Sequence, residues 1–181
     1  MQFNSFLINR TEEDFIANTI NNMKEIPKIK YIITLDSDTN LILNSAFELI
    51  GTMEHILNKP ILKDGVVIEG HGIIQPKVGI DLKEAEKSWF SRIFAGSAGT
   101  DLYTNAISDF YQDNFGEGIF TGKGIYELNT FYNVMKNAIP EYTVLSHDLL
   151  EGSYLRCGLA TDVLLMDGYP SKFMSFTTRQ N

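Results

Sequence analysis

The segment Lys30-Tyr31-Ile32-Ile33-Thr34-Leu35-Asp36-Ser37-Asp38 gives the clearest indication of the fold class. Its β-branched and aromatic run, flanked by polar residues, has the composition of a buried strand in a parallel sheet, and we expect this strand to end at Asp36. A helical pattern follows, because Ser45-Ala46-Phe47-Glu48 has the Ser-x-x-Glu form of a capping box and apolar residues then recur at helical intervals, namely Phe47, Ile50, Met53 and Ile56. A strand followed by a helix predicts an α/β fold.

The rest of the chain extends this pattern in both directions. In the first half of the chain we expect a short helix within residues 1–27, and a hairpin or two short strands at 65–69 and 72–75 before Pro76. A helical or irregular region rich in aromatic residues follows at 83–113. The second half should contain a helix around 128–135, a helix that runs from an N-cap at Ser146 to about Arg156 and is stopped by Gly158, and a last strand at 162–166. No internal repeat or linker interrupts them. We therefore expect one domain with a mixed sheet flanked by helices.

Length and charge narrow the function classes. At 181 residues, with 44% hydrophobic and 21% charged residues, the chain is long enough for one globular domain with a core. The net charge of −8 disfavours nucleic-acid binding, and an anionic ligand would need a divalent cation or a positive loop to offset repulsion.

The single cysteine, Cys157, excludes an intrachain disulfide and a cysteine-based zinc site. No apolar stretch reaches the ~18 residues of a membrane span, so we expect a soluble chain.

The first candidate site is Asp36-Ser37-Asp38, directly after the apolar strand. Ligands bind at the carboxyl ends of strands in open α/β sheets, and two carboxylates separated by one residue can place hard oxygen ligands around Mg²⁺ or Mn²⁺. Such a cation would bridge the phosphate oxygens of a nucleotide. The alternative is a pair of aspartates that only begin a turn, since turns are rich in Asp.

Two further motifs could carry chemistry. Asp148 follows Ser146 and His147 at an expected helix start, where the free N–H groups and the helix dipole favour an ionised carboxylate that can act as a general base. Ordinary helix capping explains the same residues. In the loop Gly122-Lys123-Gly124 the backbone could approach a ligand closely and the lysine could meet a phosphate or a hydroxyl, although the spacing is not that of a Walker loop and a tight turn is the simpler interpretation.

The order of these motifs resembles a known family. The strings that carry the resemblance are Thr34-Leu35-Asp36-Ser37-Asp38-Thr39, the run from Glu69 to Pro76, the run from Tyr111 to Tyr126 and the run from Leu145 to Gly152. From about residue 28 to its end, the chain resembles the glycosyltransferase domain of cyclic β-1,2-glucan synthase. More distantly, the layout resembles cellulose-synthase-like inverting transferases with the GT-A fold.

The resemblance implies a role for each matching position. Asp36 and Asp38 would hold the diphosphate of a nucleotide sugar through Mg²⁺ or Mn²⁺, and Asp148 would be the general base. His147 stands where cellulose-synthase-type relatives have Glu or Asp. The residues implied in donor or acceptor binding are Gln75 on a strand beneath the active site, Thr121, Gly122 and Lys123 in an acceptor-side loop after Phe120, and Arg179 and Gln180 at the start of a Gln/Arg-x-x-Arg-Trp motif.

The resemblance also implies a reaction and a cellular context. The reaction would be metal-assisted, inverting transfer of glucose from UDP-glucose to a growing β-1,2-glucan acceptor. The fold would be a partial GT-A fold, and residues 1–181 would be the central and C-terminal part of one glycosyltransferase domain. The parent protein would lie in the bacterial inner membrane through segments absent from this chain, with this domain on the cytoplasmic side.

Two other functions are compatible with the motifs. A haloacid-dehalogenase-type phosphatase also has a strand that ends in Asp-x-Asp, but its pattern expects Thr or Val at the position that Asn40 occupies, and no matching Lys and Asp-Asp constellation follows. A non-catalytic fragment could bind glycans or a regulatory partner through aromatic residues such as Trp89 and Tyr103, although core packing is the commoner role of such residues. Metal-dependent nucleotide binding distinguishes the transferase from a glycan-binding module.

Overall fold

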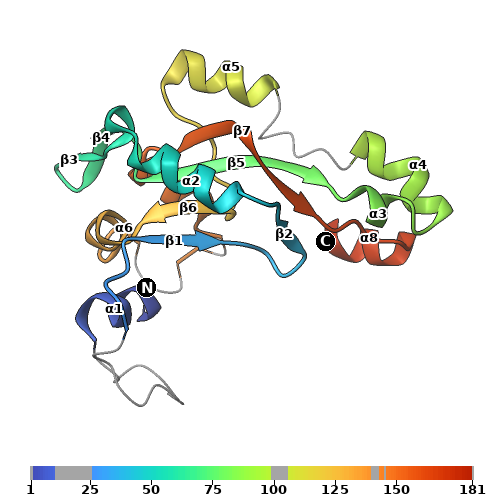
Figure 1. Ribbon diagram of the computed structural model, residues 1–181, viewed down its shortest axis with the longest axis horizontal. Coiled ribbons are helices and arrows are strands. Elements are labelled where there is room, and N and C mark those ends of the chain that lie inside the picture. Colours follow the sequence, from blue (N-terminus) through green and yellow to red (C-terminus); the bar gives the residue numbers. More distant parts are fainter. Residues whose placement is uncertain (1, 11–25, 99–105, 140–142, 145, 181) are drawn as a thin grey trace.

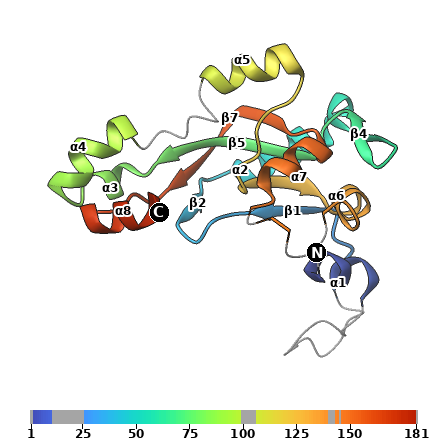
Figure 2. The same cartoon turned by 180° about the vertical axis from the view of Figure 1, so that it is seen from behind.

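A mixed five-stranded sheet with helices on both faces forms the centre of the described part of the chain (Figure 1; Figure 2). The structure is a computed structural model that describes residues 2–10, 26–98, 106–139, 143–144 and 146–180. The strand order is β1-β6-β5-β7-β2. These strands are β1 (Tyr31–Thr34), β2 (Thr39–Leu41), β5 (Ile73–Ile80), β6 (Gly124–Glu127) and β7 (Gly158–Asp167). The predicted α/β class with a mixed sheet is confirmed.

The prediction of a buried strand in a parallel sheet is wrong for β1. This strand lies at one edge of the sheet, pairs antiparallel with β6, and has four half-buried residues. In the described sheet, the parallel pair is β5 with β7, at the centre. An apolar β-branched run fits any strand with a packed face, so its composition does not reveal which neighbour pairs with it or in which direction.

The sheet is curled, and the connection between β1 and β2 explains why. These consecutive strands lie at opposite edges of the sheet, yet only residues 35–38 separate them. Across a flat sheet, four strand spacings amount to roughly 19 Å. Five residue steps reach at most about 17 Å, and a turn bond from Thr39 N to Asp36 O at 3.1 Å shortens this reach further. The edges therefore approach each other, which brings the end of β1 toward the end of β7.

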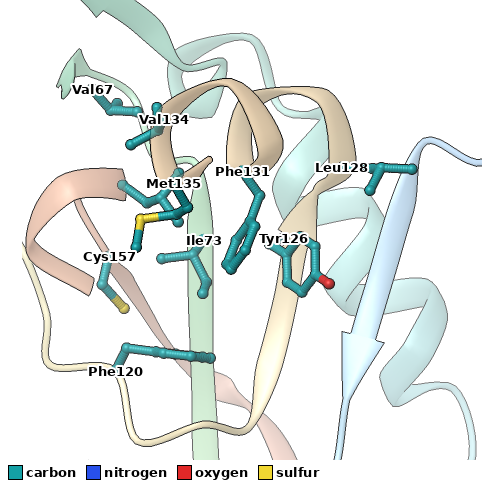
Figure 3. Close-up of a cluster of buried hydrophobic side chains, with 10 residues drawn as sticks. Val67, Ile73, Phe120, Tyr126, Leu128, Phe131, Val134, Met135 and Cys157 are labelled. Atoms are coloured by element: carbon teal, nitrogen blue, oxygen red, sulfur yellow. The ribbon is translucent and has the colours of Figure 1, made fainter. Parts of the chain in front are cut away.

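Two hydrophobic cores cover opposite faces of the sheet. Side chains alternate along a strand, so Ile73 and Ile74 of β5 belong to different cores. On one face, α6 (Leu128–Met135) and α7 (Asp148–Leu155) pack on the sheet, and Figure 3 shows this cluster, which includes Ile73, Phe120, Tyr126, Phe131, Met135 and Cys157. On the other face, α2 (Ser45–Glu54) packs through Leu49 and Met53. The sheet is thus fixed from both sides.

The remaining described elements surround this centre. They are α1 (Gln2–Asn9), a 3-10 turn η2 (Ile56–Asn58), the separate hairpin β3 (Ile61–Lys63) and β4 (Val66–Glu69), α3 (Leu82–Ala85), α4 (Trp89–Ala98), α5 (Ala106–Phe115) and α8 (Phe173–Gln180). α1 confirms a short helix within residues 1–27, of which residues 11–25 lie outside the described part of the chain. None of the helices within the described ranges is both long and apolar enough to cross a bilayer.

Both expected helix caps are wrong in detail. Asn44 occupies the N-cap of α2, and Ser45 is the first helical residue; its hydroxyl donates instead to the carbonyl of Leu164 in β7, at 2.9 Å. His147 is the N-cap of α7, without a side-chain capping bond. At the other end, Arg156 takes the left-handed conformation, with φ of 51°, and Gly158 begins β7. Tertiary partners compete for hydroxyls that a local pattern assigns to caps.

The strand boundaries and the apolar face of α2 also differ from the prediction. Gly65 to Glu69 does contribute one strand of a hairpin, but its partner is β3 rather than the segment at 72–75. Pro76 does not end β5, because the register with β7 shifts between Pro76 and Lys77 and the strand continues to Ile80. In α2, Met53 is buried, whereas Phe47 is 77% exposed. A β-bulge can accommodate a proline inside a strand, and the hydrophobic pattern of the sequence does not show where such a bulge occurs.

Candidate functional site

The turn after β1 carries the first pair of candidate carboxylates. Residues 35–38 cross from one sheet edge to the other, and Gly168 N donates to the carbonyl of Asp38 at 3.0 Å, which ties this turn to the segment after β7. Thr39, the next residue, pairs with Asp167 in the β2–β7 ladder. Asp36 and Asp38 therefore stand at the place where the curled sheet closes, with their backbone fixed by β7.

Asp167 is a third carboxylate at this place, and the sequence prediction missed it. Its Oδ1 accepts a hydrogen bond from Thr39 Oγ1 at 2.5 Å, and its Oδ2 accepts one from Lys123 Nζ at 2.5 Å. Lys123 Nζ also lies 3.1 Å from Asp36 Oδ2. Asp36, Lys123 and Asp167 line a cavity of about 390 Å³, together with Ser37 and Asp38. The sequence did contain a signal for Asp167, because this residue directly follows the apolar strand expected at 162–166, just as Asp36 follows the strand before it.

Lys123 is the cation of this cluster. Burial on its own would lower the pKa of Lys123, but hydrogen bonds and the negative charges of Asp167 and Asp36 outweigh burial, so the pKa of Lys123 is raised above its ordinary value. The side chain of Lys123 is only 14% exposed, against 57% for Asp36. The ammonium group is therefore held charged at the wall of the cavity, while Asp36 remains open to a ligand.

The loop before β6 is fixed from below by Gln75. This side chain is fully buried in β5, where its Oε1 accepts hydrogen bonds from Thr121 N at 2.9 Å and from Thr121 Oγ1 at 3.1 Å. Its Nε2 donates to the carbonyl of Pro76 at 3.0 Å. Gln75 thus lies in a strand, and its amide holds the loop at Thr121. A role of Gln75 in donor or acceptor binding stays a prediction.

The same loop places Gly122 against Asp148. Gly122 has a φ of +87°, and a Cβ at this position would lie 3.3 Å from Oδ2 of Asp148. Asp148, the first residue of α7, also accepts a hydrogen bond from Ser146 Oγ at 3.3 Å. The carboxylate therefore packs on the backbone of the loop whose next residue, Lys123, contacts Asp36. The dipeptide Gly122-Lys123 joins the two predicted sites.

A second and larger cavity lies on the Asp148 side of this loop. Its volume is about 860 Å³, and it is lined by residues of α1, β1, β6, α6 and α7, among them Thr34, Gly122, Tyr126, His147, Asp148 and Glu151. Glu151, one helical turn after Asp148, is half-buried. Burial first, and then repulsion from Asp148, raise the pKa of Glu151. The sequence prediction did not single out Glu151, although its spacing from Asp148 places both on one helix face.

Two of the predicted site residues, Arg179 and Gln180, lie in the last turn of α8. Their side chains are outside the described part of the structure. α8 itself packs on α4 through aromatic contacts, in which the Phe90 ring lies 5.9 Å from Phe173 and 5.8 Å from Phe176. The position of Arg179 and Gln180 in the site therefore stays a prediction.

The carboxylates suit a divalent cation that is shared with a ligand. Among the described residues, no group of three or more His, Cys, Asp or Glu side chains lies close enough to hold a metal ion by itself. Mg²⁺ is usually bound through one or two carboxylates together with substrate phosphates, rather than in a cage made by the protein alone. Asp36 and Asp38, which line one open cavity, offer such a partial set of oxygen ligands.

Comparison with known proteins gives one clear relationship. The chain is 42% identical over 156 residues, or 84% of its length, to the cyclic beta-(1,2)-glucan synthase NdvB of Rhizobium meliloti (strain 1021). The matched segment is only 6% of that relative, so the chain spans a small part of it. No family model matches the chain. The resemblance to the glucan synthase domain that the sequence motifs indicated is confirmed.

Proposed function

Because the chain is homologous to a segment of a cyclic β-(1,2)-glucan synthase, we propose that it forms the central and C-terminal part of a GT-A glycosyltransferase domain. This domain transfers glucose from UDP-glucose to a growing β-1,2-glucan, with inversion at the anomeric carbon. On this proposal the parent is a larger protein of the bacterial inner membrane, and residues 1–181 lie on its cytoplasmic side.

One observation supports this proposal most strongly. Lys123 contacts Asp36 in the smaller cavity, and Gly122 contacts Asp148 beside the larger cavity. A transferase needs a donor site and a base-carrying acceptor site next to each other, because the acceptor oxygen must attack the carbon that carries the leaving diphosphate. Two adjacent residues at the junction of two cavities are compatible with that requirement. If Asp36 and Asp38 served only to begin a turn, the fold would have no need to place them close to the loop that packs on Asp148.

On the donor side, Asp36 and Asp38 would hold Mg²⁺ or Mn²⁺ against the diphosphate. The cation supplies stabilisation of the negative charge that develops on the leaving UDP. Lys123 adds a second positive charge at the same wall, and Asp167 keeps it in place through the 2.5 Å hydrogen bond. In a chain with a net charge of −8, these local cations offset the repulsion of a dianionic ligand.

On the acceptor side, Asp148 acts as the general base. Its carboxylate takes the proton from an acceptor hydroxyl while that oxygen forms a bond to the anomeric carbon. The bond from the anomeric carbon to the diphosphate oxygen breaks in the same step, and its electron pair leaves with UDP. A single displacement converts the α-linked donor into a β-linked product.

Binding of the donor tests this function in the chain itself. Titration of UDP-glucose with Mn²⁺ should show binding that requires the metal and that is lost in Asp38→Ala. Asp113→Ala is the matched control, because Asp113 is an exposed carboxylate on α5 that lines neither cavity. Metal-independent binding of glucan without donor binding would contradict the transferase and favour a glycan-binding module.

A further inference from the structure

The larger cavity contains a carboxyl group that the proposed chemistry does not use. At about 860 Å³, this cavity lies within the range of roughly 300–1,000 Å³ that is typical of small-molecule sites. Glu151 lines it together with Asp148, three residues earlier on α7. The following inference rests on the proposed function, and it concerns how the acceptor is held next to the base.

One wall of the cavity is apolar and rigid. Phe120, Tyr126 and Phe131 line it, and each is at most 6% exposed. The rings of Tyr126 and Phe131, which lie beside each other in Figure 3, are stacked with centroids 4.2 Å apart. Tyr126 OH donates to Asn4 Oδ1 at 3.0 Å, which fixes this ring further. Because these three side chains are almost fully buried, they give the cavity a fixed apolar wall rather than an open stacking face, and a bound sugar must be held mainly by the polar groups of the cavity.

Glu151 is the polar group that faces this wall. Among the described residues, no hydrogen bond or salt bridge is made by the Glu151 side chain, although the charge of His147 acts on it and lowers its pKa less than burial and Asp148 raise it. The charge of Glu151 in turn contributes, after burial, to raising the pKa of Tyr126. The helix dipole alone would favour a glutamate in the first turn of α7, whichever way its side chain points. The dipole therefore does not explain why the carboxyl group of Glu151 is half-buried inside a cavity. A half-buried carboxyl that makes no hydrogen bond among the described residues and lines a ligand-sized cavity is well suited to hydroxyl groups of a ligand.

We propose that Glu151 binds hydroxyl groups of the acceptor sugar and thereby determines which acceptor hydroxyl reaches Asp148. The apolar wall limits where the acceptor can lie, Glu151 fixes the rotation of the acceptor, and Asp148 removes the proton of the attacking hydroxyl. Glu151 is therefore an acceptor-binding residue that contributes to linkage specificity, in addition to the general base.

The test measures acceptor and donor binding separately in the same chain. The acceptor probe is a disaccharide of two β-1,2-linked glucose units, and the donor probe is UDP-glucose with Mn²⁺. Glu151→Gln keeps the size of the side chain and removes its charge, and thermal unfolding checks that it folds. Because hydrogen bonds to charged groups contribute roughly 1.5–3 kcal/mol, the variant should bind the disaccharide at least about tenfold more weakly and bind the donor as the wild type does. Glu48→Gln, at an exposed position of α2 on the opposite face of the sheet, should change neither affinity.

Each outcome distinguishes the inference from the function on which it rests. Unchanged disaccharide affinity in Glu151→Gln, or a wild-type chain that binds the donor but no disaccharide, would overturn the role of Glu151 and leave the transferase proposal standing. Absence of donor binding in the wild type would instead count against the proposed function. If Glu151→Gln fails to fold, Glu151→Asp provides the second variant: the shortened carboxyl should weaken disaccharide binding and leave donor binding unchanged.

Discussion

Gly122 and Asp148 lie beside each other between the two candidate sites. A Cβ added at Gly122 would lie 3.3 Å from Oδ2 of Asp148, which is a tight contact, and the φ of +87° at Gly122 is one that other residues rarely adopt. The contact joins the loop before β6 to the first turn of α7, although 26 positions separate the two residues in the sequence. The loop and the proposed base therefore form one unit.

Substitution of Gly122 should disturb this unit. Gly122→Ala forces a side chain into the left-handed conformation, which costs roughly 1–2 kcal/mol, and pushes a methyl group toward the Asp148 carboxylate. We expect a lower free energy of unfolding by about this amount in urea titrations, and reduced glucosyl transfer in the parent enzyme. Gly51→Ala is the control: Gly51 is in α2 with no atom within 4 Å of an added Cβ, so this change should be neutral or stabilising. Equal stability of Gly122→Ala and the wild type would contradict the contact.

The buried amide of Gln75 should matter for stability as well. Gln75→Leu leaves the N–H and the hydroxyl of Thr121 without their acceptor, and an unsatisfied buried polar group costs about 1–3 kcal/mol. Thr121→Val removes only the bond from the hydroxyl at 3.1 Å, so its free energy of unfolding should fall less, by roughly 0.5–1.5 kcal/mol. Chemical denaturation of the two variants provides the comparison. A larger loss in Thr121→Val than in Gln75→Leu would show that Gln75 does not hold the loop.

The stability of the fold should depend on pH through His71. Burial lowers the pKa of His71 below its ordinary value of 6.5, and its Nδ1 lies 2.8 Å from the carbonyl of Arg156. A histidine with a lowered pKa in the folded state binds its proton more readily in the unfolded chain, so this contribution is present above pH 6.5 and is lost as the pH falls through the folded pKa. His71→Gln should therefore show a smaller loss of unfolding free energy between pH 7.5 and pH 5 than the wild type. Parallel curves for the two proteins over this interval would contradict the assignment.

Part of this fold could be predicted from the sequence because its signals are local. The α/β class follows from the apolar strand and the amphipathic helices, and α6 appears where the spacing of Leu128 to Met135 predicts it. The direction of β1 could not be predicted, because its partner β6 lies about ninety residues away and a β-branched run suits an edge as well as a centre. The cap assigned to Ser45 failed because its hydroxyl bonds to the carbonyl of Leu164, which is 119 positions away.

The residues of the candidate site also divide into those that short sequence motifs predict and those that such motifs do not single out. Asp36, Lys123 and Asp148 stand out in short motifs, and the structure brings them to one loop. Asp167 and Glu151 also had local signals, an apolar strand before the first and the spacing from Asp148 for the second. Their place in the site, however, comes from three-dimensional neighbours, namely Lys123 for Asp167 and the residues of the larger cavity for Glu151. The short connection between β1 and β2, together with the long-range pairing of β2 with β7, curls the sheet and brings Asp36 toward Asp167. No local pattern in residues 39–41 specifies that partner.

The most direct test of the proposed mechanism is the transfer rate of Asp148→Asn in the full-length enzyme that contains this chain. The amide keeps the shape of the side chain and its packing on Gly122, but it cannot accept the proton of the acceptor hydroxyl. General bases contribute about 10²–10⁴-fold to rates, so we expect the transfer of glucose from UDP-glucose to fall by at least about 100-fold while donor affinity stays unchanged. Transfer at the wild-type rate in Asp148→Asn would contradict the assignment of the base and with it the central claim.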